Sequence, residues 1–212
     1  PMWKKKDSSS CKLDLIRMFE CLNDEYCNKR NLPLWVVPNI WAPEQGIEEI
    51  FKQISFRKIK EITSHNSIIL PLDLNIDELR KRLRKNWRNH LNKSEKNAID
   101  IEYGNEGEQF EKLRKLYFEM HNRKGFKRYI DIDKYRIIQD KLPNELRPAI
   151  MIAYHNKLPA SAIYWSQIGN TAVTIFSATG EIGMKLGSSY LLRWELVKKL
   201  LNNGIKYLDQ GG

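Results

Sequence analysis

Apolar residues recur every three to four positions along several stretches of this chain, a spacing typical of amphipathic helices. The longest stripe begins after Asn75, a residue suited to capping a helix start. The pattern predicts one long helix from this point, with Ile76, Leu79, Leu83, Trp87 and Leu91 on its apolar side. A second helix buries Phe110, Leu113, Tyr117 and Met120. Four further helices are predicted over about 11–29, 43–54, 131–142 and 188–202.

Short apolar runs bounded by proline, glycine and asparagine predict strands between these helices. Those runs lie at about 32–39, 56–62, 66–74, 98–103, 147–156, 160–169, 171–180 and 205–209. Turn residues at Asn156-Lys157 and Gly169-Asn170 favour an antiparallel meander within the second half. The order of elements predicts an α+β (mixed α/β) protein whose mixed central sheet is flanked by helices, with one domain over 1–70 and another over 71–212.

Composition adds a constraint on partners. The chain has 36 Lys+Arg against 26 Asp+Glu, a formal net charge of +10, which favours polyanionic partners. Three cysteines and four histidines lack the spacings of a disulfide framework or a metal site, so we expect reduced thiols and no metal. No apolar run approaches the roughly 18 residues of a membrane helix, and no secretory signal is present. These features predict a cytoplasmic protein.

The densest positive charge lies between Arg80 and Lys96, where eight basic residues accompany one acid, Glu95. Because arginine grips phosphate through two hydrogen bonds, this segment predicts contacts with phosphate groups or RNA. The residues expected to make them are Arg80, Arg84, Lys85 and Arg88. The alternative is a solvated helix face with extended basic side chains.

Two further segments carry candidate anion-binding groups. Arg123, Arg128 and Tyr135 belong to a stretch where basic and aromatic residues alternate, suited to holding a phosphate and stacking a base or sugar. An ordinary connection between two helices explains that stretch equally well.

The second segment, "GMKLGSSY", sets Gly187, Ser188 and Ser189 at a predicted helix start, where free backbone N–H groups attract anions. A plain serine-capped helix is the alternative. Acetyltransferases of the GNAT superfamily hold the pyrophosphate of coenzyme A with an R/Q-x-x-G-x-G/A loop, which this segment resembles in shape but not in sequence, since Met184 stands at its first position.

Four segments together resemble the FemAB family of peptidoglycan interpeptide-bridge peptidyltransferases, relatives of the GNAT-like acyltransferases. They are "LDLNIDELRKRLRKNWRNHLNKSEKNAIDIE", "NRKGFKRYIDIDKY", "LPASAIYWSQIGNTAVTIFSATG" and "GSSYLLRWELVKKLLNNGIKYLDQGG", within residues 65–212. Most specific are "WRNHLNKSEKNAI", which resembles the family's R-x-x-x-x-K-A-E-K-x-G/A segment, and the closing W-E…G-I-K-Y-x-D-x-G-G. The resemblance implies two GNAT-like subdomains, the first partial and the second truncated at its C-terminus.

The same resemblance implies an enzyme that transfers an aminoacyl group from aminoacyl-tRNA to an amine of a peptidoglycan or other cell-envelope precursor. Arg128 and Tyr135, supported by Arg123, would hold phosphates of a nucleotide- or lipid-linked precursor at the inner face of the membrane. Donors for the oxyanion would come from the splayed strand at 176–179, and Asp209 would handle a proton or orient a substrate. The residue-based alternative for Asp209 is a structural acid that holds the Gly-Gly turn.

Two other functions fit the sequence. One is an acyl-CoA-dependent N-acyltransferase in polysaccharide biosynthesis, which would use a coenzyme A thioester in place of aminoacyl-tRNA. The other is a non-catalytic RNA- or glycan-binding module on the same fold. In the best-known Fem ligases, a lysine beyond the Gly-Gly strand lies near the reacting carbonyl, and the sequence up to Gly212 holds no counterpart to it.

Overall fold

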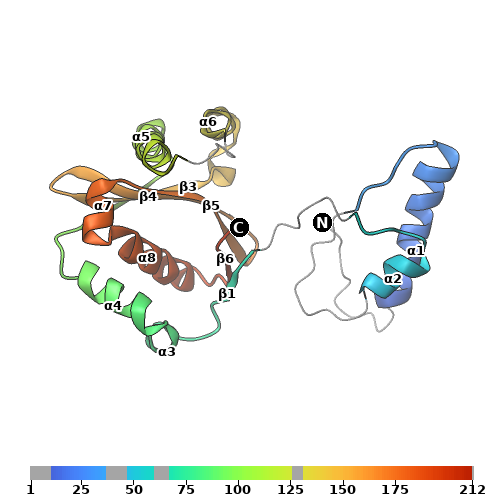
Figure 1. Ribbon diagram of the computed structural model, residues 1–212, viewed down its shortest axis with the longest axis horizontal. Helices are drawn as coiled ribbons and strands as arrows, with labels where there is room; N and C mark the ends of the chain where they lie inside the picture. Colours follow the sequence, from blue (N-terminus) through green and yellow to red (C-terminus); the bar gives the residue numbers. More distant parts are fainter. Residues whose placement is uncertain (1–10, 37–46, 60–66, 126–130, 212) are drawn as a thin grey trace. The chain divides into compact units, whose positions relative to one another are not determined.

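The computed structural model describes residues 11–36, 47–59, 67–125 and 131–211. They fall into two compact units, divided after residue 64 (Figure 1). The first unit contains α1 (Cys11–Asn23), the π-helical turn η1 (Asp24–Lys29) and α2 (Ile47–Gln53). The rings of Phe19, Phe51 and Phe56 pack together with centroids 5.0–5.8 Å apart, so an aromatic cluster joins the two helices.

The helix predicted over 11–29 is confirmed, and α2 confirms the described part of the helix over 43–54. The strands predicted at 32–39 and 56–62 are wrong in their described parts, 32–36 and 56–59, which have no regular structure. Trp35 is 65% exposed while Leu34 and Val36 are half-buried, and no described strand pairs with this run. The remaining residues of both runs lie outside the described ranges.

The second unit is built on a six-stranded sheet in the order β1-β6-β5-β4-β3-β2. Its strands are β1 (Ile69–Pro71), β2 (Asp100–Gly104), β3 (Ala149–His155), β4 (Leu158–Ile168), β5 (Thr171–Thr179) and β6 (Tyr207–Asp209). All neighbours pair antiparallel except β5 and β6, which run parallel. The predicted meander is therefore confirmed, and Asn156 and Lys157 both have the positive φ of a two-residue hairpin turn.

Helices cover both faces of this sheet (Figure 1). They are α3 (Ile76–Arg82), α4 (Lys85–Ser94), α5 (Gly107–Lys124), α6 (Ile132–Lys141), the 3-10 turn η2 (Asn144–Leu146), α7 (Glu181–Leu186) and α8 (Ser188–Asn202). One core lies between the sheet and α3, α4 and α8, and the other lies between the sheet and α5 and α6. The predicted class, a mixed sheet flanked by helices, is confirmed. Within the described residues, no helix has the length and apolar character needed to cross a membrane.

The long helix predicted after Asn75 is wrong, because the chain leaves the helical conformation at Leu83 and Arg84. Asn75 caps α3 as expected, accepting a hydrogen bond from the Glu78 N–H at 3.0 Å. The guanidinium of Arg80 bonds the Glu95 carboxylate at 2.7 Å. In one straight helix these residues would lie roughly 22 Å apart along the axis, so the ion pair requires the break. The predicted apolar stripe is buried nonetheless.

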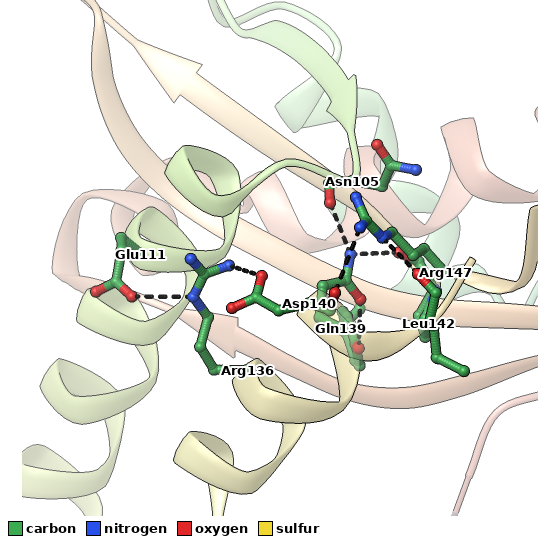
Figure 2. A network of polar contacts seen from close by, with 9 residues as sticks. Asn105, Glu111, Arg136, Gln139, Asp140, Leu142 and Arg147 are labelled. Carbon is green, nitrogen blue, oxygen red and sulfur yellow. Dashed lines mark hydrogen bonds and ion pairs between the residues drawn. The ribbon is translucent and has the colours of Figure 1, made fainter. Parts of the chain in front are cut away.

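A polar network fixes α6 to the sheet on the opposite face (Figure 2). Gln139, 1% exposed, donates to the carbonyls of Asn105 at 2.7 Å and Pro148 at 3.1 Å. Its side-chain oxygen accepts the hydroxyl of the fully buried Tyr164 at 2.8 Å. Burial raises the pKa of Tyr164, so this hydroxyl stays protonated and donates.

Replacing Gln139 with leucine is expected to lower the free energy of unfolding by about 2–3 kcal/mol, because two buried polar groups, the Pro148 carbonyl and the Tyr164 hydroxyl, and one part-buried group, the Asn105 carbonyl, lose their partner. Urea unfolding followed by circular dichroism measures it. In the double variant Gln139→Leu/Tyr164→Phe, the orphaned hydroxyl is gone, and we expect part of the loss to be recovered. Strict additivity of the two substitutions would contradict a coupled network.

Candidate functional site

The parallel strands β5 and β6 part soon after they pair, and polar groups gather where they do so. Their last paired residues are Val173 and Asp209. Beyond them, a bulge shifts the β4–β5 register, so that Thr174 pairs with Trp165 and Ser177 with Ile163. Trp165 and Ile163 both belong to the core beneath α8. The bulge therefore turns Thr174 and Ser177 to the same face, although strict alternation would put residues three apart on opposite faces.

Arg193 of α8 bridges this parting of the strands. Its guanidinium donates to the Ser177 hydroxyl at 3.2 Å and to the side-chain oxygen of Gln210, just after β6, at 2.8 Å. Arg193 is half-buried and forms no ion pair with any described residue. Burial lowers the pKa of Arg193, but an arginine keeps its proton at neutral pH. The site thus holds a cation whose two partners are neutral.

Two polar atoms on the elements that carry the site are buried and have no hydrogen-bond partner among the described residues. They are the Thr174 hydroxyl of β5 and the indole N–H of Trp194, the residue after Arg193 in α8. Because buried polar groups are usually satisfied, Trp194, which also lines a neighbouring cavity, is a candidate for a hydrogen bond to a ligand or solvent.

A cavity of about 490 Å³ extends from this point between β1, α3, the start of α4 and α8. We call it the arginine cavity. Leu70, Leu79, Leu83, Val197, Trp87 and Trp194 supply apolar walls, and Arg82, Arg84 and Arg193 supply positive charge against one carboxylate, Asp73. Its volume lies within the range of small-molecule sites, about 300–1,000 Å³. Charge and apolar surface together suit an amphiphilic anion.

The four residues predicted to bind nucleic acid occupy different settings. Arg84 lines the arginine cavity, and Lys85 is exposed on the first turn of α4. Arg88 donates to the Lys81 carbonyl at 3.2 Å and so closes the last turn of α3. Arg80 is held by Glu95 and Asn92 and lies over the Trp194 ring, so its charge is already compensated. Contact with nucleic acid at any of these residues stays a prediction.

The Arg80–Glu95 pair makes stability depend on acidity. The Arg80 guanidinium holds the pKa of Glu95 below its usual range. Such a carboxylate stabilises the fold above its unfolded pKa of about 4.3, and this contribution is lost as the pH falls through the lower, folded-state pKa. We therefore expect the urea midpoint to fall more for the wild type than for Glu95→Gln when the pH drops below about 4. Parallel pH profiles for the two proteins would contradict this.

The segment before the last helix differs from the predicted loop. Residues 181–186 form α7, and α8 begins at Ser188 as predicted, with Gly187 between them at φ +66°. The Ser188 side chain is fully buried and donates to the Ser161 hydroxyl at 2.9 Å. Its hydroxyl therefore serves the core. The Gly187 N–H already donates to the Met184 carbonyl at 3.3 Å, so an anion there could use only the backbone N–H groups of Ser188 and Ser189, and anion binding at this segment stays a prediction.

The basic-aromatic segment divides between structural contacts and residues outside the described ranges. Arg123 donates to the Thr179 carbonyl at 3.0 Å and contacts the Met184 sulfur, so it ties α5 to the end of β5 and to α7. Tyr135 packs against Tyr164 and Phe176 in the core beneath α5 and α6. Arg128 lies outside the described residues. A precursor-binding role for these three residues stays a prediction.

Asp209 makes the contacts expected of a structural acid that holds the Gly-Gly turn. Its carboxylate accepts the Gly211 N–H at 2.8 Å and the Ser67 hydroxyl, so it holds the Gly-Gly turn and joins it to the segment before β1. Gly211 itself has φ +74°, a conformation that glycine adopts without strain. Proton handling by Asp209 stays a prediction.

Sequence reasoning missed Arg193, the residue at the centre of this site. A signal for it does exist. In α8 the neighbours Leu191, Leu192 and Trp194 are all buried, so an arginine among them must enter the protein interior with at least part of its side chain. A cation within an apolar run indicates a functional residue, because burying an unpaired charge costs free energy.

Comparison with solved structures identifies the fold. The structure superimposes on that of FemX with a TM-score of 0.78 at 13% sequence identity, over 97% of this chain and 69% of FemX. A conserved protein of unknown function from Bacteroides thetaiotaomicron matches with a TM-score of 0.58 at 13% identity, over 93% of this chain and 66% of that one.

L-PGS from Bacillus licheniformis matches with a TM-score of 0.51 at 15% identity, over 68% of this chain and 45% of that one. The C-terminal domain of an Agrobacterium fabrum protein assigned as a lysylphosphatidylglycerol synthetase matches with a TM-score of 0.52 at 9% identity, over 68% and 45%. The chain thus spans under half of each of these two. No protein-family model and no curated protein matches the sequence. The protein has the FemX fold, which confirms the FemAB-like fold that the sequence predicts.

Proposed function

We propose that this protein is an acyltransferase that moves an aminoacyl group from aminoacyl-tRNA to an amine of a peptidoglycan or other cell-envelope precursor. The observation that carries the proposal is the position of Arg193, a half-buried guanidinium at the parting of β5 and β6. The fold shared with FemX, and the likeness to two lysylphosphatidylglycerol synthetase structures, support aminoacyl transfer as the class of reaction.

Aminoacyl transfer requires a positive charge or hydrogen-bond donors close to the reacting carbonyl. The attacking amine must be neutral, and when it adds to the ester carbonyl of the donor, negative charge develops on the carbonyl oxygen. Collapse of this intermediate expels the ribose oxygen of the tRNA, which takes up the proton that the amine releases. The guanidinium donates to Ser177 and Gln210, which fix its orientation, so its charge and its remaining N–H groups would stabilise the oxyanion without reorganising during the reaction.

A transfer assay tests the proposal. The protein is incubated with charged tRNA and a nucleotide-linked muramyl pentapeptide, and the peptide is examined by mass spectrometry for one added aminoacyl residue. Uncharged tRNA is the matched control, and an acyl-CoA arm tests the competing donor. An added aminoacyl residue that appears only in the arm with charged tRNA supports the proposal. Product that appears only in the arm with acyl-CoA would contradict it and favour the coenzyme A-dependent N-acyltransferase.

Filter binding across a salt series separates donor binding from catalysis. If three to four of the basic side chains contact phosphates, log K for tRNA should fall with log[salt] with a slope of roughly −2 to −4. Salt-dependent tRNA binding with no transfer to any offered amine would favour a non-catalytic RNA-binding module. Product without measurable tRNA binding would point to another donor.

A further inference from the structure

The break between α3 and α4 brings two arginines to one cavity. Arg82 ends α3, Leu83 and Arg84 are extended, and α4 starts at Lys85. In a continuous helix, residues two apart lie about 200° apart around the axis, so Arg82 and Arg84 would project to nearly opposite sides. With the break, both line the arginine cavity.

These two guanidinium groups are uncommitted. Neither Arg82 nor Arg84 forms an ion pair or a side-chain hydrogen bond with a described residue, in contrast to Arg80, which Glu95 neutralises. Both are exposed, so they reach solvent as well as the cavity. The hydrogen bond from Arg88 to the Lys81 carbonyl helps to hold the break in place.

The charges and walls of the cavity define the ligand. Three guanidinium groups, those of Arg82, Arg84 and Arg193, against the Asp73 carboxylate leave two net positive charges. A phosphate monoester carries about −1.5 to −2 at neutral pH, so one such group balances the site. Trp87 and Trp194 line the cavity beside it, and the Trp194 indole N–H is a buried donor without a described partner. A ligand with an organic body would cover this apolar surface, which inorganic phosphate cannot do.

We propose that the arginine cavity is a binding site for an organic phosphate, with the phosphate held between Arg82 and Arg84 and the organic body lying along Trp87 and Trp194 toward Arg193. Arg193 belongs both to this cavity and to the proposed transfer site, but the phosphate contacts of Arg82 and Arg84 do not depend on the proposed reaction. A nucleoside monophosphate and a glycerol phosphate share this chemistry, and binding measurements distinguish them.

Isothermal titration calorimetry on the full chain tests the site with four probes: AMP, sn-glycerol 3-phosphate, inorganic phosphate and adenosine. We expect AMP or glycerol 3-phosphate to bind, and to bind at least tenfold more tightly than inorganic phosphate and adenosine. Whichever of the two binds more tightly identifies the source of the phosphate. Equal affinity for inorganic phosphate and both organic phosphates would overturn the proposal, because the apolar walls would then contribute nothing.

The variant Arg82→Gln/Arg84→Gln should weaken binding of the preferred probe at least tenfold, since charge-assisted hydrogen bonds to the phosphate are lost. Both side chains are exposed and lack protein partners, so the urea midpoint should not change. Lys141→Gln is the matched control, because Lys141 is exposed at the end of α6, on the opposite face of the sheet. Equal weakening by Lys141→Gln would show a non-specific charge effect and overturn the site.

The outcomes for this site and for the proposed function are separable. Organic phosphate binding that depends on Arg82 and Arg84, with no aminoacyl product from the same preparation, keeps the site and removes the transfer. Transfer that proceeds unchanged in Arg82→Gln/Arg84→Gln, with no probe bound, keeps the transfer and removes the site.

Discussion

Replacement of Arg193 by glutamine is expected to lower the turnover number for aminoacyl transfer by about 100-fold, with little change in KM. Removal of one preorganised donor to a developing oxyanion costs about 10²–10³ in other acyl-transfer sites. Glutamine keeps a hydrogen-bond donor near Ser177 and Gln210 but removes the charge, so the fall in turnover number measures the contribution of the positive charge. Because the interaction forms in the transition state, the ground-state affinity should change little.

Initial rates at saturating charged tRNA and precursor measure this effect. Arg193→Lys keeps the charge without the planar fork, and we expect it to recover part of the activity. The circular dichroism spectrum and the urea midpoint of each variant show whether the fold is intact. An equal fall in activity for lysine and glutamine, with a large rise in KM, would mean that Arg193 only positions the substrate.

Replacement of Gly183 by alanine is expected to destabilise the second unit by about 3 kcal/mol, at the upper end of the cost of overpacking. Gly183 lies in α7 and is buried against β4. A Cβ at this position would overlap the Ala160 carbonyl oxygen and would lie 2.8 Å from both the carbonyl carbon of Ala160 and the Ser188 hydroxyl oxygen. The Ala160 carbonyl oxygen accepts the Gly180 N–H at 3.0 Å, and this hydrogen bond limits the freedom of the β4 backbone to move away.

Urea unfolding of Gly183→Ala measures the change, and Gly107→Ala provides the control. A Cβ at Gly107 would meet only the guanidinium end of Arg136, a flexible side chain that moves aside at low cost. We expect the control to stay within about 1 kcal/mol of the wild type, helped by the better helix propensity of alanine. If the urea midpoint of Gly183→Ala differs from that of the wild type no more than the midpoint of Gly107→Ala does, α7 shifts freely against β4.

The fold of the second unit was largely readable from the sequence because its signals are local and agree with each other. The start of α8 at Ser188, its stop at Asn203-Gly204 and the hairpin turn at Asn156-Lys157 each follow from residues within one turn of the boundary. The break at Leu83 and Arg84 has no such signal, since no proline or glycine marks it. It depends instead on a tertiary contact, the pairing of Arg80 with Glu95.

The candidate site was less predictable for the same reason. Charge density drew attention to Arg80, Arg84, Lys85 and Arg88. Arg80 and Arg88 are engaged by protein groups, whereas Arg84 lines the arginine cavity together with Arg82, which the charge pattern did not single out. The apolar run around Arg193 indicates that its side chain enters the interior, but its partners could not be read from the sequence, because they lie 16 and 17 residues away in opposite directions along the chain. Periodicity reports which face of an element is buried, but not which polar groups meet inside.

The two outer strands of the sheet bear on solubility at high concentration. At one edge, β1 has only three residues and ends in Pro71, whose nitrogen cannot donate a hydrogen bond to another chain. At the other edge, β2 carries the carboxylates of Asp100 and Glu102. A short, proline-ended border and an acidic one both disfavour the addition of a strand from a second molecule, so this sheet is poorly suited to template aggregation.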